Sequence, residues 1–89
     1  MDQVTAEVQD AASAVQTSYE RLLIVRDEVS VSRQLEDAER TRFDLGEGTL
    51  FQLNLREQAT VESVQREISA QADYQRSQAS YQAAIGIVP

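Results

Sequence analysis

The sequence contains no cysteine, no histidine and no tryptophan, and it has only one proline and three glycines among 89 residues. Without cysteine there is no disulfide, thiol nucleophile or thiolate metal ligand. Without histidine the chain lacks the commonest general base and the commonest metal ligand. We therefore predict no catalytic residue, no cofactor and no metal site, and we expect that the chain is not an enzyme.

The charge balance limits the expected partners. Fifteen acidic residues stand against eight basic ones, which gives a net charge of −7. Nucleic acid and anionic membrane surfaces both need a positive counter-surface, so neither is an expected partner. The sequence also has no apolar run of the roughly 18 residues that a membrane-spanning helix needs. We expect no direct membrane span within these residues.

The apolar content is low, since 42% of the residues are apolar and 6% are aromatic. A short chain with so little apolar mass does not build a compact core of normal size. Ala, Glu, Gln, Arg and Leu dominate the sequence, and these residues favour helices. Helix-on-helix packing needs less apolar mass than a globular core, so the composition predicts an all-α protein.

Residues 3–44 contain no glycine or proline and carry apolar residues in two heptad-spaced stripes. Steps of three, four or seven residues are typical of a coiled-coil seam. A helix over about 3–44 with two offset seams can contact neighbours on two sides, which indicates a larger bundle or a barrel of helices. The first stripe is Val4, Val8, Ala11, Val15, Leu22, Val25 and Val29. The second stripe is Ile24, Val31, Leu35, Ala38 and Leu45.

A turn is predicted at residues 45–49. Gly46 can adopt the left-handed conformation that ends a helix. Thr49 and Gln52 have the spacing of a capping box, which begins a helix. A connection this short makes the two helices antiparallel and adjacent.

The second helix is predicted over about 50–85, with Gly86 and Pro89 as its stop signal. It also has two apolar stripes. The chain is thus predicted to be a single unit, a long antiparallel two-helix coiled-coil hairpin. One stripe is Val61, Val64, Ile68, Ala72, Ala79 and Ile85. The other is Ala70, Tyr74, Tyr81 and Ala84.

The polar residues match no catalytic or ion-binding pattern. Asp44 and Glu47 lack the alternating oxygen ligands of a calcium loop. The segment Gly46-Glu47-Gly48 follows no strand, and Glu47 would repel a phosphate. The apolar cluster at the turn leaves two interpretations open, a plug that closes the hairpin end or an exposed docking knob. Its members are Phe43, Leu45, Leu50, Phe51 and Leu53.

The turn and its flanks resemble the TolC-like outer-membrane efflux proteins. That family has an aromatic residue, a glycine three positions later, a Ser or Thr three further on, and then leucine and other apolar positions. In residues 38–59 these places are filled by Phe43, Gly46, Thr49, Leu50 and Leu53. Alanine-rich heptads before the turn and the closing segment 83–86 also resemble the family, so the resemblance covers nearly the whole chain.

The resemblance implies a location and a partner. Family members are trimers whose subunits give strands to an outer-membrane barrel and helices to a periplasmic α-barrel. This chain would be one hairpin of that α-barrel, in the periplasmic portion of a bacterial outer-membrane protein. Its turn would dock the tip of the periplasmic adaptor (membrane fusion) protein of a tripartite efflux or secretion system. The implied docking tip is Arg42, Phe43, Leu45, Gly46, Glu47, Gly48, Thr49 and Leu50.

Two other functions remain open from the sequence. The periplasmic adaptor itself carries a hairpin, whose tip has an arginine, a leucine seven residues later and a serine seven further on. Around Leu45 those places hold Ala38 and Gln52, so the adaptor pattern does not fit. A generic structural coiled-coil spacer is the second alternative. A spacer has little need for the Phe–Gly–Thr–Leu pattern at the turn.

Overall fold

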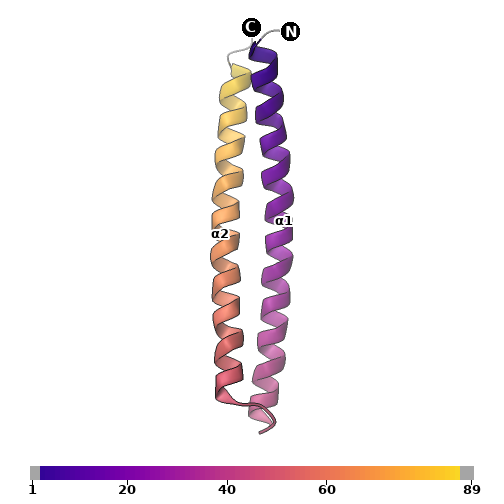
Figure 1. Ribbon diagram of the computed structural model, residues 1–89, viewed down its shortest axis with the longest axis vertical. Coiled ribbons are helices and arrows are strands. Elements are labelled where there is room, and N and C mark those ends of the chain that lie inside the picture. Colours follow the sequence, from indigo (N-terminus) through magenta and orange to yellow (C-terminus); the bar gives the residue numbers. More distant parts are fainter. Residues whose placement is uncertain (1–2, 87–89) are drawn as a thin grey trace.

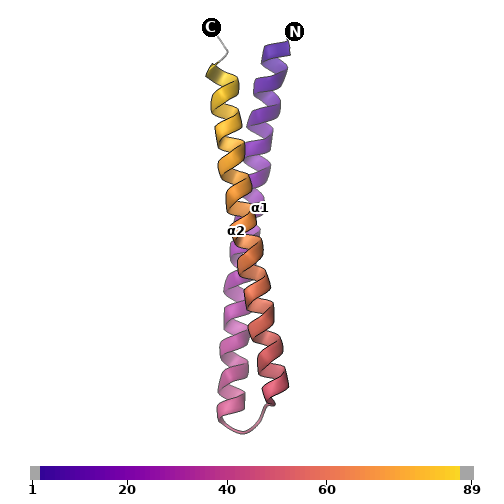
Figure 2. The same ribbon diagram turned by 90° about the vertical axis from the view of Figure 1, so that its left-hand side faces the viewer.

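The computed structural model describes residues 3–86, which form two long α-helices in a hairpin (Figure 1). Helix α1 spans Gln3–Asp44 and helix α2 spans Leu50–Gly86. The hairpin measures 67 × 14 × 13 Å. In the view of Figure 2 the helices cross near the middle, as helices with heptad-spaced contacts do when they coil around each other. The prediction of an all-α antiparallel hairpin is confirmed.

The ends of the helices lie close to the predicted positions. The connection covers residues 45–49, and α2 extends to Gly86, one residue beyond the end that the sequence predicted. The predicted stop at Pro89 falls outside the described residues. No helix within residues 3–86 is both long enough and apolar enough to cross a membrane.

The contact between the helices follows one stripe on each of them. In α1 the buried and half-buried residues from Val4 to Glu39 recur at alternating steps of four and three residues. Ala6 is the one exception among them. The main apolar cluster joins Leu22 and Val25 of α1 to Ala70 and Tyr74 of α2. The first stripe of α1 therefore meets the second stripe of α2. The second stripe of α1 is exposed at Ile24, Val31 and Leu35, and the first stripe of α2 is exposed at Val61 and Ile68 but half-buried at Val64 and Ala72.

The composition of this seam changes along the rod. We call residues 3–29 with 64–86 the terminal half, and residues 30–63 the tip half. In the terminal half the seam is apolar around Leu22, Val25 and Val29, although Ser18 and Ser77 share a 2.7 Å hydrogen bond across it. In the tip half the same series continues mostly with polar side chains, although Leu53 is buried there as well. The polar ones are Ser32, Glu36 and Glu39 on α1, and Glu57, Thr60 and Ser63 on α2.

Candidate functional site

The turn is built by two capping motifs that follow each other directly. At the end of α1, the Gly46 N–H donates to the Phe43 carbonyl (3.0 Å) and the Glu47 N–H donates to the Arg42 carbonyl (2.8 Å). This pair of bonds is the Schellman motif, which needs a left-handed residue at its centre. Gly46 is that residue, with φ of 76°. Glycine is required here because a side chain would strain this backbone conformation.

The start of α2 is a complete capping box. The Thr49 N–H donates to the side-chain oxygen of Gln52 (3.2 Å), and the Gln52 N–H donates to the Thr49 hydroxyl (3.1 Å). Both backbone donors would otherwise lack a helical partner. The two motifs together satisfy the backbone of the turn and hold it in one shape.

Arg42 and Gly48 tie the turn back to α1. The Arg42 guanidinium donates to the Glu39 carboxylate (3.3 Å) and to the Glu47 carbonyl (3.4 Å). A Cβ at Gly48 would lie 3.0 Å from the Glu39 carboxylate, so the loop backbone passes close to this side chain. Glu39 is buried beneath the turn, whereas Asp44 and Glu47 are exposed. The sequence did not predict that Glu39 would support the turn.

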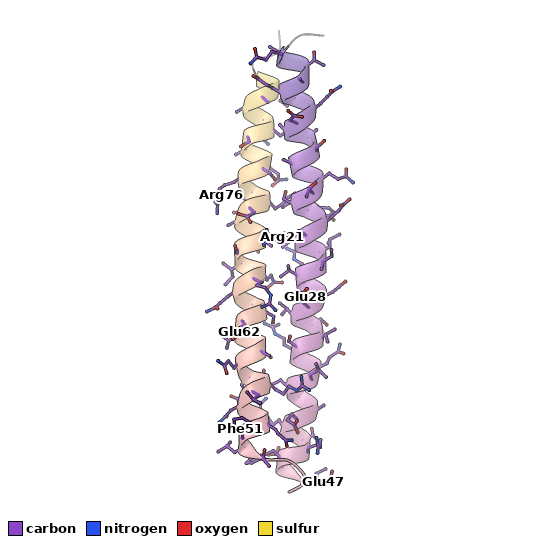
Figure 3. The ribbon with its side chains drawn as sticks, in the orientation of Figure 1. Arg21, Glu28, Glu47, Phe51, Glu62 and Arg76 are labelled. Carbon is purple, nitrogen blue, oxygen red and sulfur yellow. The ribbon has the colours of Figure 1, made fainter. Side chains whose placement is uncertain are left out.

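Most apolar residues at the turn face the solvent. Leu45 is 69% exposed and Phe51 is 71% exposed, and Phe43 and Leu50 are exposed as well. Figure 3 shows Glu47 at the tip and Phe51 on the side of α2 that points away from α1. Only Leu53 is buried. The plug interpretation therefore fits Leu53 alone, and the other four residues form an exposed apolar tip.

The second stripe of α1 lies beside a line of ion pairs on one face of the rod. Arg21 pairs with Asp73 (3.5 Å) and Arg66 pairs with Glu28 (3.6 Å) across the two helices. Arg21 and Glu28 lie along the line between the helices in Figure 3. Between the helices runs a shallow groove of about 440 Å³. It is lined by Ile24, Asp27, Glu28, Val31, Ser32 and Arg66.

The exposed stripe of α2 lies on the opposite face. Arg66 marks the face of α2 that carries the ion pairs. At 3.6 residues per turn, Val61 and Ile68 point about 140–160° away from Arg66 around the axis of α2. Val61, Ile68, Ile24 and Val31 are all more than half exposed. The two helices thus present apolar stripes in opposite directions, at about the same height along the rod.

Glu36 titrates at a pKa that its neighbours on both helices shift. A hydrogen bond from Thr60, then a hydrogen bond and the charge of Arg40, hold the pKa of Glu36 below its ordinary value. Arg40 donates to its carboxylate at 2.9 Å. Within residues 3–86 no three acidic side chains converge to form a metal site. Glu36 and Glu39 each accept a hydrogen bond from an arginine of their own helix.

We expect the hairpin to lose stability in acid partly through Glu36. Its pKa is lower in the folded than in the unfolded chain, so the folded state binds fewer protons. The stabilisation is present above the unfolded pKa and disappears as the pH falls through the folded pKa. Denaturant unfolding followed by circular dichroism at about pH 7 and about pH 3 measures this loss. Glu36→Gln should show a smaller loss than the parent, and an equal loss would contradict the assignment.

No protein-family model, curated protein or solved structure matches this chain.

Proposed function

We propose that this chain is a periplasmic α-hairpin of a TolC-like outer-membrane channel, and that its turn docks the tip of the periplasmic adaptor protein. The observation that carries the proposal is the apolar tip on a fully capped turn. Phe43, Leu45 and Leu50 are exposed there, around the Gly46 and Thr49 positions that resemble the family. The role is one of binding, and it requires no catalytic residue.

The rigidity of the turn favours docking. Binding energy is lost when a loop must be ordered on association, and a preformed loop avoids that loss. The Schellman motif and the capping box hold the backbone on both sides of Glu47 before any partner arrives. The exposed leucines are thus presented in a constant arrangement. Arg42 and Glu47 are exposed at the same turn and can supply polar contacts at the rim.

The two lateral stripes support a place in a ring of helices. A hairpin that functions alone as a spacer gains nothing from exposed apolar residues on two faces, which favour association. A hairpin in an α-barrel has a neighbour on each side. The stripe of α1 around Ile24 and Val31 and the stripe of α2 around Val61 and Ile68 point to opposite sides, as two neighbours require.

Docking can be tested with the 89-residue chain and a hairpin peptide from an adaptor encoded in the same genome. Leu45→Ser removes an exposed side chain at the tip, and Leu23→Ser removes an exposed one on the shaft. We expect titration calorimetry to show that Leu45→Ser weakens binding by about tenfold or more, the effect of losing a contact worth about 1.4 kcal/mol. Leu23→Ser should leave the affinity unchanged. Absence of binding, or equal effects of both variants, would favour the spacer alternative.

Self-association provides a separate test of the lateral stripes. We expect sedimentation equilibrium to show dimers or larger oligomers as the concentration approaches about 1 mM, a range in which weak apolar contacts become populated. Ile68→Glu places a charge in the α2 stripe and should shift the chain toward the monomer. Glu62→Gln is the matched control on an exposed position of the same helix. A parent chain that stays monomeric throughout would contradict a role in a ring of hairpins.

A further inference from the structure

The seam of the tip half is mostly polar, whereas the seam of the terminal half is mostly apolar. The seam of the tip half holds carboxylate and hydroxyl side chains, and two of these, Glu39 and Ser63, are buried. Apart from the buried Leu53, the large apolar side chains of the tip half face outward. The exposed ones are Val31, Leu35, Phe43, Leu45, Leu50, Phe51, Leu55 and Val61. Burial of apolar surface is the main stabilising contribution to helix pairing, so pairing is weaker in the tip half.

The ion pairs also indicate that the helices are held together less strongly in the tip half. In the terminal half three ion pairs join α1 to α2: Arg21 to Asp73, Arg26 to Glu67 and Arg66 to Glu28. In the tip half each ion pair of the described residues joins two residues of α1. These pairs are Arg40 to Glu36, Arg40 to Asp37 and Arg42 to Glu39. Separation of the helices in the tip half therefore breaks none of its ion pairs.

The hydrogen bonds across the seam of the tip half are few. The Thr60 hydroxyl lies 3.3 Å from the Ser32 carbonyl of α1 and 3.1 Å from the Arg56 carbonyl of its own helix. The Glu36 carboxylate of α1 is a further acceptor for this hydroxyl. A hydroxyl has one hydrogen, so the bonds to α1 compete with the bond within α2. The buried Ser63 hydroxyl also donates within α2, to the Thr60 carbonyl at 2.8 Å. Ser63 is thus satisfied within its own helix, whereas Thr60 shares its one hydrogen between acceptors on both helices.

We infer that the hairpin opens in two steps, in which the tip half loses its helix pairing as a unit while the terminal half stays paired through its apolar seam. The boundary lies near Val29 and Val64, where the apolar seam ends. Such units of low local stability are the parts of a protein that change order when a partner binds. The inference concerns the contacts within this chain, and it holds whether or not the turn docks an adaptor.

Native-state hydrogen exchange on the 89-residue chain tests the two steps. We expect the amides of residues 33–40 and 55–62 to exchange at least about tenfold faster than those of residues 20–27 and 66–73.

Glu36→Leu replaces a seam side chain that is 18% exposed with an apolar one. It should slow exchange in the tip half by about tenfold and leave the terminal half unchanged. Asp37→Leu, at a side chain that is 79% exposed, is the matched control and should not slow it.

Limited trypsin digestion gives a second measurement that needs no variant. All eight basic residues are arginines, so they mark the trypsin sites. They divide evenly between the halves. The tip half contains Arg33, Arg40, Arg42 and Arg56, and the terminal half contains Arg21, Arg26, Arg66 and Arg76. Mass spectrometry of the first fragments should find cleavage in the tip half. The inference is overturned if both halves are equally protected from exchange or are first cleaved equally often. It is also overturned if the Glu36 and Asp37 variants have similar effects.

Discussion

Leu22→Ala is expected to lower the free energy of unfolding by about 2–3 kcal/mol, within the range found for leucine-to-alanine changes in protein cores. Leu22 is 2% exposed and lies in the main apolar cluster with Val25, Ala70 and Tyr74. A rod this thin has no second layer of side chains that could move in to fill the cavity. Because the apolar seam holds the terminal half together, this is the position where one side chain contributes most. Urea denaturation followed by circular dichroism measures the change.

Leu23→Ala is the matched control for this prediction. Leu23 is the next residue of the same helix and is 42% exposed. Both substitutions exchange leucine for alanine, so the change in helix propensity is the same. The loss at Leu23 should be about 0.5 kcal/mol or less, as for other surface substitutions. Equal losses of unfolding free energy at the two positions would show that Leu22 does not lie in the contact between the helices.

Gly46→Val is expected to destabilise the hairpin by about 2 kcal/mol, because a left-handed conformation costs a residue with a side chain about 1–2 kcal/mol and a β-branched one more. No atom lies within 4 Å of a Cβ placed at Gly46, so the cost comes from the backbone and not from crowding. The strain would disturb the Schellman motif and move Leu45 and Glu47. Docking to an adaptor hairpin should then weaken by about tenfold or more, a loss that corresponds to about 1.4 kcal/mol.

Gly46→Asn separates backbone strain from the loss of glycine itself. Asparagine tolerates the left-handed conformation better than other residues with side chains. Its cost should stay below about 1 kcal/mol, with docking close to that of the parent chain. If Gly46→Val destabilises the hairpin and leaves docking unchanged, the tip is not the docking surface. If Gly46→Val has no effect on stability, the left-handed turn itself is wrong.

The rigid turn and the weakly paired tip half bear on each other when a partner binds. The turn is held by local backbone hydrogen bonds, while the tip half behind it is held by a polar seam. A partner that covers the outward apolar residues of the tip half would add the burial that the seam lacks. Docking at the turn and ordering of the tip half are therefore expected to strengthen each other, and an adaptor hairpin should slow exchange at residues 33–40.

The sequence by itself determined the helices and the turn. Those features depend on local interactions: Gly46 supplies the left-handed residue, Thr49 and Gln52 cap α2, and a glycine-free stretch keeps α1 continuous. The heptad spacing also showed that each helix carries two apolar stripes. All of this is encoded within a few residues of each position, so sequence patterns suffice to predict it.

Only the tertiary structure decided which stripes meet and what the seam contains. A stripe on one helix looks the same whether it packs inside the hairpin or faces a neighbour, because the choice depends on both helices and on how the turn rotates them. The first apolar stripe of α1 stops at Val29, yet the contact continues through Ser32, Glu36 and Glu39. Polar side chains at seam positions are recognised as such only when the opposite helix is in place. The same reason separates the exposed tip residues from the buried Leu53.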